Sequence, residues 1–198
     1  MASAWRAGRT AVLLLGLTAA VAAAAPTSEI DIEERSVSYR VFGRSAPELA
    51  EQMRQYGPQH GYGSRRLAGS TQWHVTWTYR SEQRRGRCVL EHVSVSADIV
   101  TTLPEWSGAR VDSKLAREWR RFMAGLRAHE AGHVRHGREA VAAVRDAMLA
   151  APAQTDCKAL RRQLDNAARA QLRRYTGLTR RYDADTDYGL SQGVQLRP

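Results

Sequence analysis

The segment His129-Glu130-Ala131-Gly132-His133 lies near the middle of a long stretch, from about residue 114 to residue 150, whose apolar residues recur every three or four positions. This spacing places one apolar stripe along an α-helix. Both histidines continue the stripe, so they are predicted to face the core with its other members: Leu115, Trp119, Phe122, Leu126, Ala140, Val144 and Met148. The rest of the fold is expected to pack against this helix.

Two histidines four residues apart return to the same helix face, offset by about 40° and by about 6 Å along the axis. Both imidazoles can reach one ion, so His129 and His133 fit two ligands of a catalytic zinc. Glu130 lies about 100° around the helix, near enough to take a proton from water, and is predicted to be a general base. The alternative is a pair of core histidines whose hydrogen bonds are satisfied within the protein.

Three glycines, Gly125, Gly132 and Gly137, interrupt the predicted helix. Each costs a helix about 1 kcal/mol, so each calls for a reason. At Gly132 two explanations are open: close approach of a substrate or a neighbouring strand to the metal face, or simple tight packing.

The first 24 residues have the pattern of a secretory signal peptide. Arg6 and Arg9 lie in a basic leader, an apolar run follows from Ala11, and small residues allow cleavage after Ala24. The strongly apolar part is shorter than the roughly 20 residues of a spanning helix, which favours cleavage over an uncleaved anchor. The protein is therefore predicted to be exported, periplasmic or extracellular, with residues 25–198 forming a single domain.

Two cysteines, Cys88 and Cys157, remain after the predicted cleavage. An even number of cysteines in an oxidising compartment points to one disulfide, here between a predicted strand and the helix after the motif. The alternative role as metal ligands is weaker, because neither cysteine lies in a Cys-x-x-Cys or Cys/His cluster.

The chain is strongly basic, with a net charge of +10. Removing Arg6 and Arg9 leaves 28 basic and 20 acidic residues, a net charge of +8. Most of the excess is arginine in dispersed pairs, at positions 65–66, 84–85, 120–121, 161–162, 173–174 and 180–181. Exported proteins seldom meet nucleic acid, so no nucleic-acid partner is expected, and an anionic cell-envelope surface is the predicted partner of any functional patch.

Three segments alternate between apolar and polar residues as half-buried strands do. The first covers residues 30–42, and the second, residues 73–79, has an aromatic inner face. A turn at Arg84-Arg85-Gly86 is predicted to join the second to a third strand, which Pro104 closes. One face of the third strand is expected to hold Val89, Val93, Val95, Ala97 and Ile99.

Two further helices are predicted around the motif helix. A capping box at Ser45 begins a short helix that Gly57 ends. A long helix begins at Thr155 or Asp156, after the motif helix, and is expected to end at Gly177. The predicted fold class is therefore α+β: an antiparallel β-sheet containing a hairpin, packed against two long C-terminal helices, the first a zincin-like active-site helix.

A catalytic zinc usually has three protein ligands, so one more is needed. His136 lies about 10 Å along a straight helix from His129, too far for all three imidazoles to share an ion. The tail Asp185-Thr186-Asp187-Tyr188-Gly189 resembles the D-x-x-Y-G end of the deuterolysin motif. That resemblance implies that Asp185 binds zinc and that Tyr188 assists the oxyanion.

The chain as a whole resembles a bacterial family of predicted secreted zinc-dependent proteases, also described as a domain of unknown function. The resemblance covers most of residues 25–198 and rests on Thr71-x-Trp73, Cys88, Leu103-Pro104-x-Trp106, Phe122-x-x-x-Leu126-x-x-His129-Glu130-x-x-His133, Cys157 and Tyr182-Asp183-x-x-Thr186-x-Tyr188-Gly189-x-x-Gln192-Gly193. The family pattern has a histidine where this chain has Tyr188, and a histidine there is a natural third ligand. The resemblance therefore implies that Tyr188 or a neighbouring aspartate replaces it, and Asp183, in the family's Tyr-Asp pair, ranks above Asp185.

Two functions are consistent with these patterns. The first is a secreted zinc-dependent peptidase acting on polypeptides, with His129, His133 and a tail carboxylate on the metal, Glu130 as base and Tyr188 or Tyr182 at the oxyanion. The second is a catalytically degenerate envelope protein, in which the same residues hold a structural metal or none and the arginine surface binds anionic polymer. Neither pattern indicates an oligomeric state.

Overall fold

The computed structural model describes residues 25–59, 66–107 and 114–197, so the predicted signal peptide, residues 1–24, lies outside the described part of the chain. The elements follow in the order β1 (Thr27–Phe42), α1 (Ala46–Tyr56), β2 (Ser70–Arg84), β3 (Arg87–Ser107), α2 (Lys114–Leu149), α3 (Cys157–Asp185) and a short 3-10 turn, η1 (Leu190–Gln192). Among these described helices, none is both long and apolar enough to cross a bilayer.

The three strands form one sheet in the order β1-β3-β2. β2 and β3 make the predicted hairpin, and Arg85 and Gly86 at its turn have the positive φ angles, 49° and 75°, that such a tight turn requires. β1 lies on the other side of β3 and runs parallel to it. The predicted α+β class is confirmed. The sheet is mixed, however, and the prediction of a wholly antiparallel sheet was wrong. Alternation along a strand shows which face is buried but not the direction of the neighbouring strand.

The third strand differs from the prediction in its buried face. Val93, Val95, Ala97 and Ile99 are buried as expected, but near the hairpin the buried residues are Cys88 and Leu90 and not Val89. The register shifts between Arg80 and Ser81 of β2, which leaves an extra residue in β3. Such a β-bulge reverses the alternation of side chains, and this is why the prediction for Val89 was wrong.

β3 also continues past Pro104, where it was predicted to end. The pairing of β2 with β3 stops at Thr102, so Pro104 pairs only with Tyr39 of β1. A proline is tolerated in a strand where one side lacks a partner, because its missing N–H then breaks no ladder hydrogen bond.

Two helices, α1 and α3, begin where their caps predict. The Ser45 side chain accepts a hydrogen bond from the backbone N–H of Glu48 at the start of α1, and Asp156 caps α3 in the same way through Ala159. α3 continues through Gly177, however, and ends only at Asp185. The cost of one helical glycine, about 1 kcal/mol, is smaller than the gain from the later turns of α3, which pack on α2.

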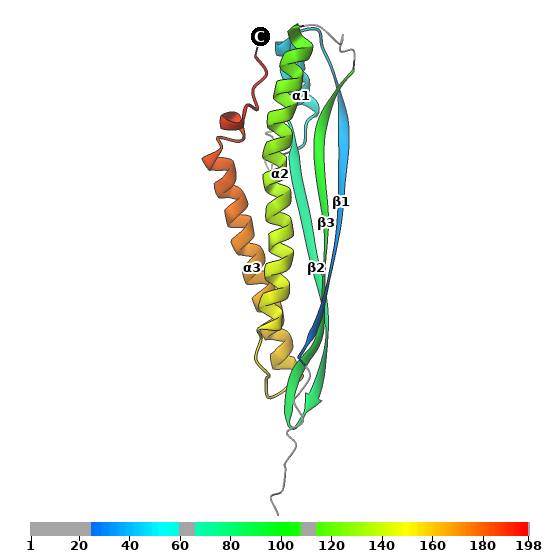
Figure 1. Ribbon diagram of the computed structural model, residues 1–198, viewed down its shortest axis with the longest axis vertical. Helices are drawn as coiled ribbons and strands as arrows, with labels where there is room; N and C mark the ends of the chain where they lie inside the picture. Colours follow the sequence, from blue (N-terminus) through cyan, green and yellow to red (C-terminus); the bar gives the residue numbers. More distant parts are fainter. Residues whose placement is uncertain (1–24, 60–65, 108–113, 198) are drawn as a thin grey trace, which may run out of the picture.

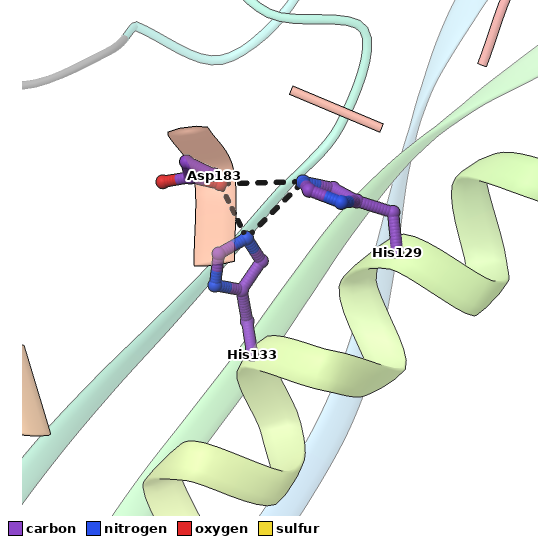
Figure 2. Close-up of side chains that lie close together, drawn as sticks. All are labelled: His129, His133 and Asp183. Atoms are coloured by element: carbon purple, nitrogen blue, oxygen red, sulfur yellow. Dashed lines mark hydrogen bonds and ion pairs between the residues drawn. The ribbon is translucent and has the colours of Figure 1, made fainter. Parts of the chain in front are cut away.

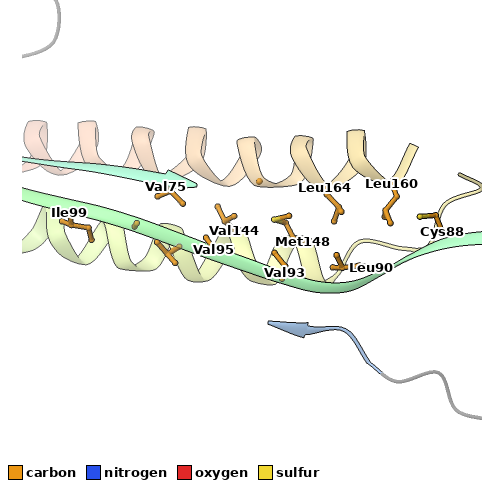
Figure 3. Packing of buried hydrophobic residues seen from close by; sticks show 13 residues of the cluster. Val75, Cys88, Leu90, Val93, Val95, Ile99, Val144, Met148, Leu160 and Leu164 are labelled. Atoms are coloured by element: carbon orange, nitrogen blue, oxygen red, sulfur yellow. The ribbon is translucent and has the colours of Figure 1, made fainter. Parts of the chain in front are cut away.

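α2 and α3 form an antiparallel pair along the sheet, as Figure 1 shows. Their apolar stripes meet the inner faces of β2 and β3 in one core (Figure 3), which includes Val75, Val93, Val95, Ile99, Val141, Val144, Met148, Leu160, Leu164 and Ala168. A second cluster joins α1 to the first half of α2 and the end of β1, through Val41, Leu49, Met53, Phe122, Met123 and Leu126. The histidine motif lies on α2 between these two cores.

The structure contains the predicted disulfide between Cys88 and Cys157, whose Cα atoms are 5.1 Å apart. The bond ties the start of β3 to the first residue of α3. Backbone hydrogen bonds in both directions between Cys88 and Gln154 hold the loop before α3 against the same strand.

Replacing both Cys88 and Cys157 with alanine should lower the free energy of unfolding by about 2–4 kcal/mol. The two cysteines are 69 positions apart, so the disulfide closes a long loop and restricts the unfolded chain. Denaturant unfolding of oxidised wild type and the double variant measures the difference. Wild type treated with a reductant should unfold like the double variant. Equal stability of oxidised and reduced wild type would contradict the prediction.

Candidate metal centre

The two histidines of the motif lie one turn apart on α2, and both are buried. α3 runs beside them and places Asp183 opposite (Figure 2). The Nε2 atoms of His129 and His133 are 3.2 Å apart, and Asp183 Oδ1 lies 3.3 Å from the first and 2.9 Å from the second. Three potential ligand atoms therefore converge, in the one group of this kind that the described residues contain.

These distances suit a shared metal ion. Atoms bound at about 2.1 Å to one ion lie about 3.4 Å apart in a tetrahedral site and about 3.0 Å apart in an octahedral one. The observed separations of 2.9, 3.2 and 3.3 Å are close to this range. Imidazole nitrogen and carboxylate oxygen are also common ligands of zinc and related metals. The donor set is therefore compatible with metal binding.

His129 is held in the orientation that a metal ligand needs. Its Nδ1 lies 2.9 Å from Gln192 Oε1. An amide oxygen only accepts hydrogen bonds, so Nδ1 carries a proton, and Nε2, which faces the cluster, is the nitrogen that would bind a metal ion. The ring of Tyr182 stacks on the imidazole at 5.1 Å, and the tyrosine hydroxyl donates to the backbone carbonyl of His129 at 3.2 Å. A partner on the second nitrogen is usual for metal-binding histidines.

His133 is held by packing. Its ring lies nearly perpendicular to that of Tyr182, with the ring centroids 5.1 Å apart, and its Nδ1 is buried with no hydrogen-bond partner in the described part of the chain. Burying a polar ring in this way is costly. Coordination through Nε2 would offset part of that cost.

Asp183 is ionised at neutral pH. Burial acts to raise the pKa of this carboxyl, but hydrogen bonds with His129 and His133, and the charge of the histidines, outweigh burial and hold the pKa well below its usual range. For His129, burial acts to lower the pKa, but the hydrogen bonds with Asp183 and Gln192 reverse the sign and raise it. Asp183 is thus available as an anionic ligand.

Glu130, the predicted general base, is only 3% exposed. The hydroxyl of Thr71, on β2, donates a hydrogen bond of 2.8 Å to Glu130 Oε2. Burial raises the pKa of Glu130 above its ordinary value, while the Thr71 hydrogen bond and the two histidines act in the opposite direction. A carboxyl with a raised pKa is suited to proton transfer near neutral pH.

The cluster opens into a cavity of about 200 Å³. Its walls come from α2, α3, the chain before β2 and the start of β2 itself, at residues 67–72. His129, Glu130, His133, Asp183 and Tyr188 all line it. Of the residues that the sequence predicted as ligands, base or oxyanion donor, Asp185 and Tyr182 do not line this cavity.

Asp185 is the second aspartate predicted as a ligand. It lies two residues beyond Asp183 on α3, which turns it about 160° away from the cluster, and it is exposed. Tyr188 lies just past the helix, with a positive φ of 51° and 40% of its surface exposed. The structure thus brings Asp183 and Tyr188 to the cavity but not Asp185. His136 is likewise absent from the cluster, as its spacing predicted.

The sequence did not predict the roles of three further residues at the site. Thr71 binds Glu130, Gln192 binds His129, and Tyr182 supports both histidines from behind instead of facing the cavity. All three occur in the family pattern quoted above, which was the available signal. Their roles depend on contacts between segments far apart in the sequence, so the pattern alone could not assign them.

The tail after α3 folds back onto α2 to bring Gln192 to the site. Gly189 has a φ of 85°, and a Cβ there would lie 2.6 Å from Val194 and 3.1 Å from the ring of His129. Only glycine combines this backbone conformation with such close packing. At Gly125 of α2, a Cβ would lie 2.6 Å from the carbonyl oxygen of Gln192, so this helical glycine admits the returning tail.

Gly132 is explained by packing against α3. A Cβ there would lie 2.3–2.6 Å from ring and hydroxyl atoms of Tyr182. The tight-packing explanation is therefore confirmed at this position, and the neighbour is a helix and not a strand.

Replacing Gly132 with alanine should lower the free energy of unfolding by about 1–2 kcal/mol, because the displaced Tyr182 ring costs more than the gain in helix propensity. Gly177→Ala is the matched control: a Cβ there meets nothing within 4 Å, so the same change should stabilise by about 0.5–1 kcal/mol. Thermal or denaturant unfolding measures both variants. The prediction fails if Gly132→Ala is as stable as Gly177→Ala.

The fold and the site define an α+β protein in which a helix pair carries a cluster of two buried histidines and one half-buried aspartate beside a buried glutamate. The chain belongs to a family described as bacterial protein of unknown function (DUF922), whose sequence model matches residues 36–189. The match includes both cysteines, the histidine motif, Asp183 and Tyr188. No curated protein matches the chain. No solved structure matches it either.

Proposed function

We propose that this protein is an exported zinc-dependent peptidase. The observation that carries the proposal is the convergence of His129, His133 and Asp183 in one cavity with a buried carboxyl, Glu130. Two imidazoles and one carboxylate leave a coordination position open, as catalytic zinc sites do and structural sites do not. Bound zinc would supply Lewis acidity, polarising a substrate carbonyl and making a water acidic at neutral pH.

The protein groups would divide the remaining work. Glu130 accepts the proton of the attacking water and returns it to the leaving amine, a role that its burial and its bond to Thr71 support. Gln192 and Tyr182 keep the imidazole of His129 in place. The Tyr188 hydroxyl donates a hydrogen bond to the oxyanion from the cavity wall.

A polypeptide substrate fits the surroundings of the cavity. Ser70, Thr71 and Gln72 line it and belong to β2, which is at the edge of the sheet and pairs only with β3 among the described strands. An unpaired strand edge can form backbone hydrogen bonds with an extended peptide. Export is supported by the disulfide and by the predicted signal peptide.

The test uses protein recovered from the bacterial periplasm after expression of the full chain, purified without chelator. It should contain about one zinc per chain and should hydrolyse unfolded protein, and a chelator should remove both properties reversibly. Absence of zinc after purification, together with no uptake on titration, would overturn the proposal.

Replacing Tyr188 with phenylalanine should lower turnover by about 100-fold and leave the zinc content unchanged, because the change removes an oxyanion donor and no ligand. Steady-state hydrolysis and metal analysis of the same preparation separate the two effects. Replacing the exposed Tyr56, in α1, with phenylalanine is the control. Loss of zinc from Tyr188→Phe would instead make Tyr188 a ligand.

A further inference from the structure

Helix α3 carries a row of basic side chains along one side. Successive members are four, seven, four and seven residues apart, so at 100° per residue all of them fall within a sector of about 60° and extend over about 33 Å. All are exposed: Lys158, Arg162, Arg169, Arg173 and Arg180. We call these five residues the basic row.

The charge of the basic row is not compensated within the described protein. Seven arginines elsewhere form ion pairs with carboxylates: Arg35, Arg54, Arg84, Arg121, Arg135, Arg138 and Arg145. No ion pair in the described chain involves a member of the basic row. The acids of α3 itself are Asp165, which accepts from the indole of Trp77, Asp183, which belongs to the metal centre, and Asp185 at the helix end.

The outward face of α3 also carries no large side chain along its centre. Its centre line, next to the basic row, holds only small or uncharged side chains: Ala159, Asn166, Ala170, Gly177 and Ala184. On the other side of that line lie two more exposed arginines, Arg174 and Arg181. Leu160, Leu164 and Ala168 on the opposite face are buried, and α3 forms one long side of the molecule (Figure 1). The helix backbone can therefore come close to a plane, with cations on both sides of the contact.

We propose that the outward face of α3 docks the protein on a bilayer of anionic phospholipid, with the helix axis parallel to the membrane plane. A planar partner fits better than a single polymer strand, because cations flank a smooth centre line instead of forming one isolated row. The face offers no large apolar side chain between the cations, so the attachment is electrostatic and peripheral. Arg180 lies one turn before Asp183, so docking would hold the cavity next to the membrane surface.

Flotation with lipid vesicles tests this proposal on the periplasmic protein. Vesicles of phosphatidylcholine containing roughly one-third phosphatidylglycerol should bind it, vesicles of phosphatidylcholine alone should not, and salt should release it. Replacing Arg162, Arg169, Arg173 and Arg180 together with glutamine should weaken binding by at least ~100-fold, because each cation near an anionic bilayer contributes roughly fivefold.

The matched control removes the same charge elsewhere, at the exposed residues Arg40, Arg44, Arg80 and Arg127. It should lose much less binding than the α3 variant. Equal loss in both variants, or binding to neutral vesicles, would overturn the proposal. So would retention on a soluble linear polyanion such as dextran sulfate without binding to anionic vesicles, which would assign the face to a polymer. Glu130→Gln protein should float like wild type, so the outcome does not depend on the proposed peptidase activity.

Discussion

Glu130→Gln protein should retain its zinc and lose at least ~1,000-fold in turnover of unfolded protein. The amide keeps the size of the side chain but cannot accept a proton from the attacking water. The three ligand atoms come from His129, His133 and Asp183, so the first coordination shell is untouched. The remaining contact, from Thr71 to Oε2, can be made to an amide oxygen as well as to a carboxylate.

The measurement pairs hydrolysis of an unfolded protein with metal analysis of the same sample. Glu139→Gln is the matched control, because Glu139 lies on α2 but is exposed and pairs only with Arg135 among the described residues. It should behave like wild type. Unchanged hydrolysis in Glu130→Gln would mean that the activity arises from a contaminant or from another site, and a non-catalytic envelope protein would then be the better description.

Asp183→Asn should weaken zinc binding by at least ~100-fold, while Asp185→Asn should leave it unchanged. Loss of a support outside the ligand set typically costs 10- to 100-fold in metal affinity, and loss of a charged ligand should cost at least as much. The two variants differ by two positions on one helix, yet only Asp183 faces the histidines. Competition with a chromophoric chelator measures the affinity.

His133→Ala supplies the positive reference for this comparison, since it removes a ligand that the motif itself predicts. If Asp185→Asn loses zinc and Asp183→Asn keeps it, the third ligand comes from outside the cluster described above. If all three variants bind zinc as wild type does, zinc binds elsewhere and the proposed centre is wrong.

Local sequence patterns predicted much of the fold. The 3-4 spacing around His129 and His133 predicted α2, the capping residues Ser45 and Asp156 predicted where two helices begin, and the turn at Arg85 and Gly86 predicted the hairpin. The disulfide followed from the number of cysteines and the expected compartment. The helices and the hairpin depend on residues within a few positions of one another. The disulfide was predicted from cysteine chemistry, without knowing how the strands and helices pack.

The errors arose where neighbours in space override local preference. A bulge moved the buried position from Val89 to Leu90, and packing against α2 carried α3 through Gly177. Pro104 stays in a strand because β2 pairs with β3 only as far as Thr102. In each case the local signal was real. The free energy that it represents, about 1 kcal/mol for a helical glycine, was smaller than that of the tertiary contacts competing with it.

The candidate site shows the same division. The sequence by itself determined that two histidines and a glutamate share one stretch of helix, because 3.6 residues per turn places positions four apart on one face. It left Asp183 and Asp185 both open as ligands and could not assign Thr71 to Glu130 or Gln192 to His129. The rotation of α3 about its axis selects Asp183, and the return of the tail past Gly125 and Gly189 brings Gln192 to His129. Both features result from the packing of whole helices, which leaves no periodic pattern in the sequence.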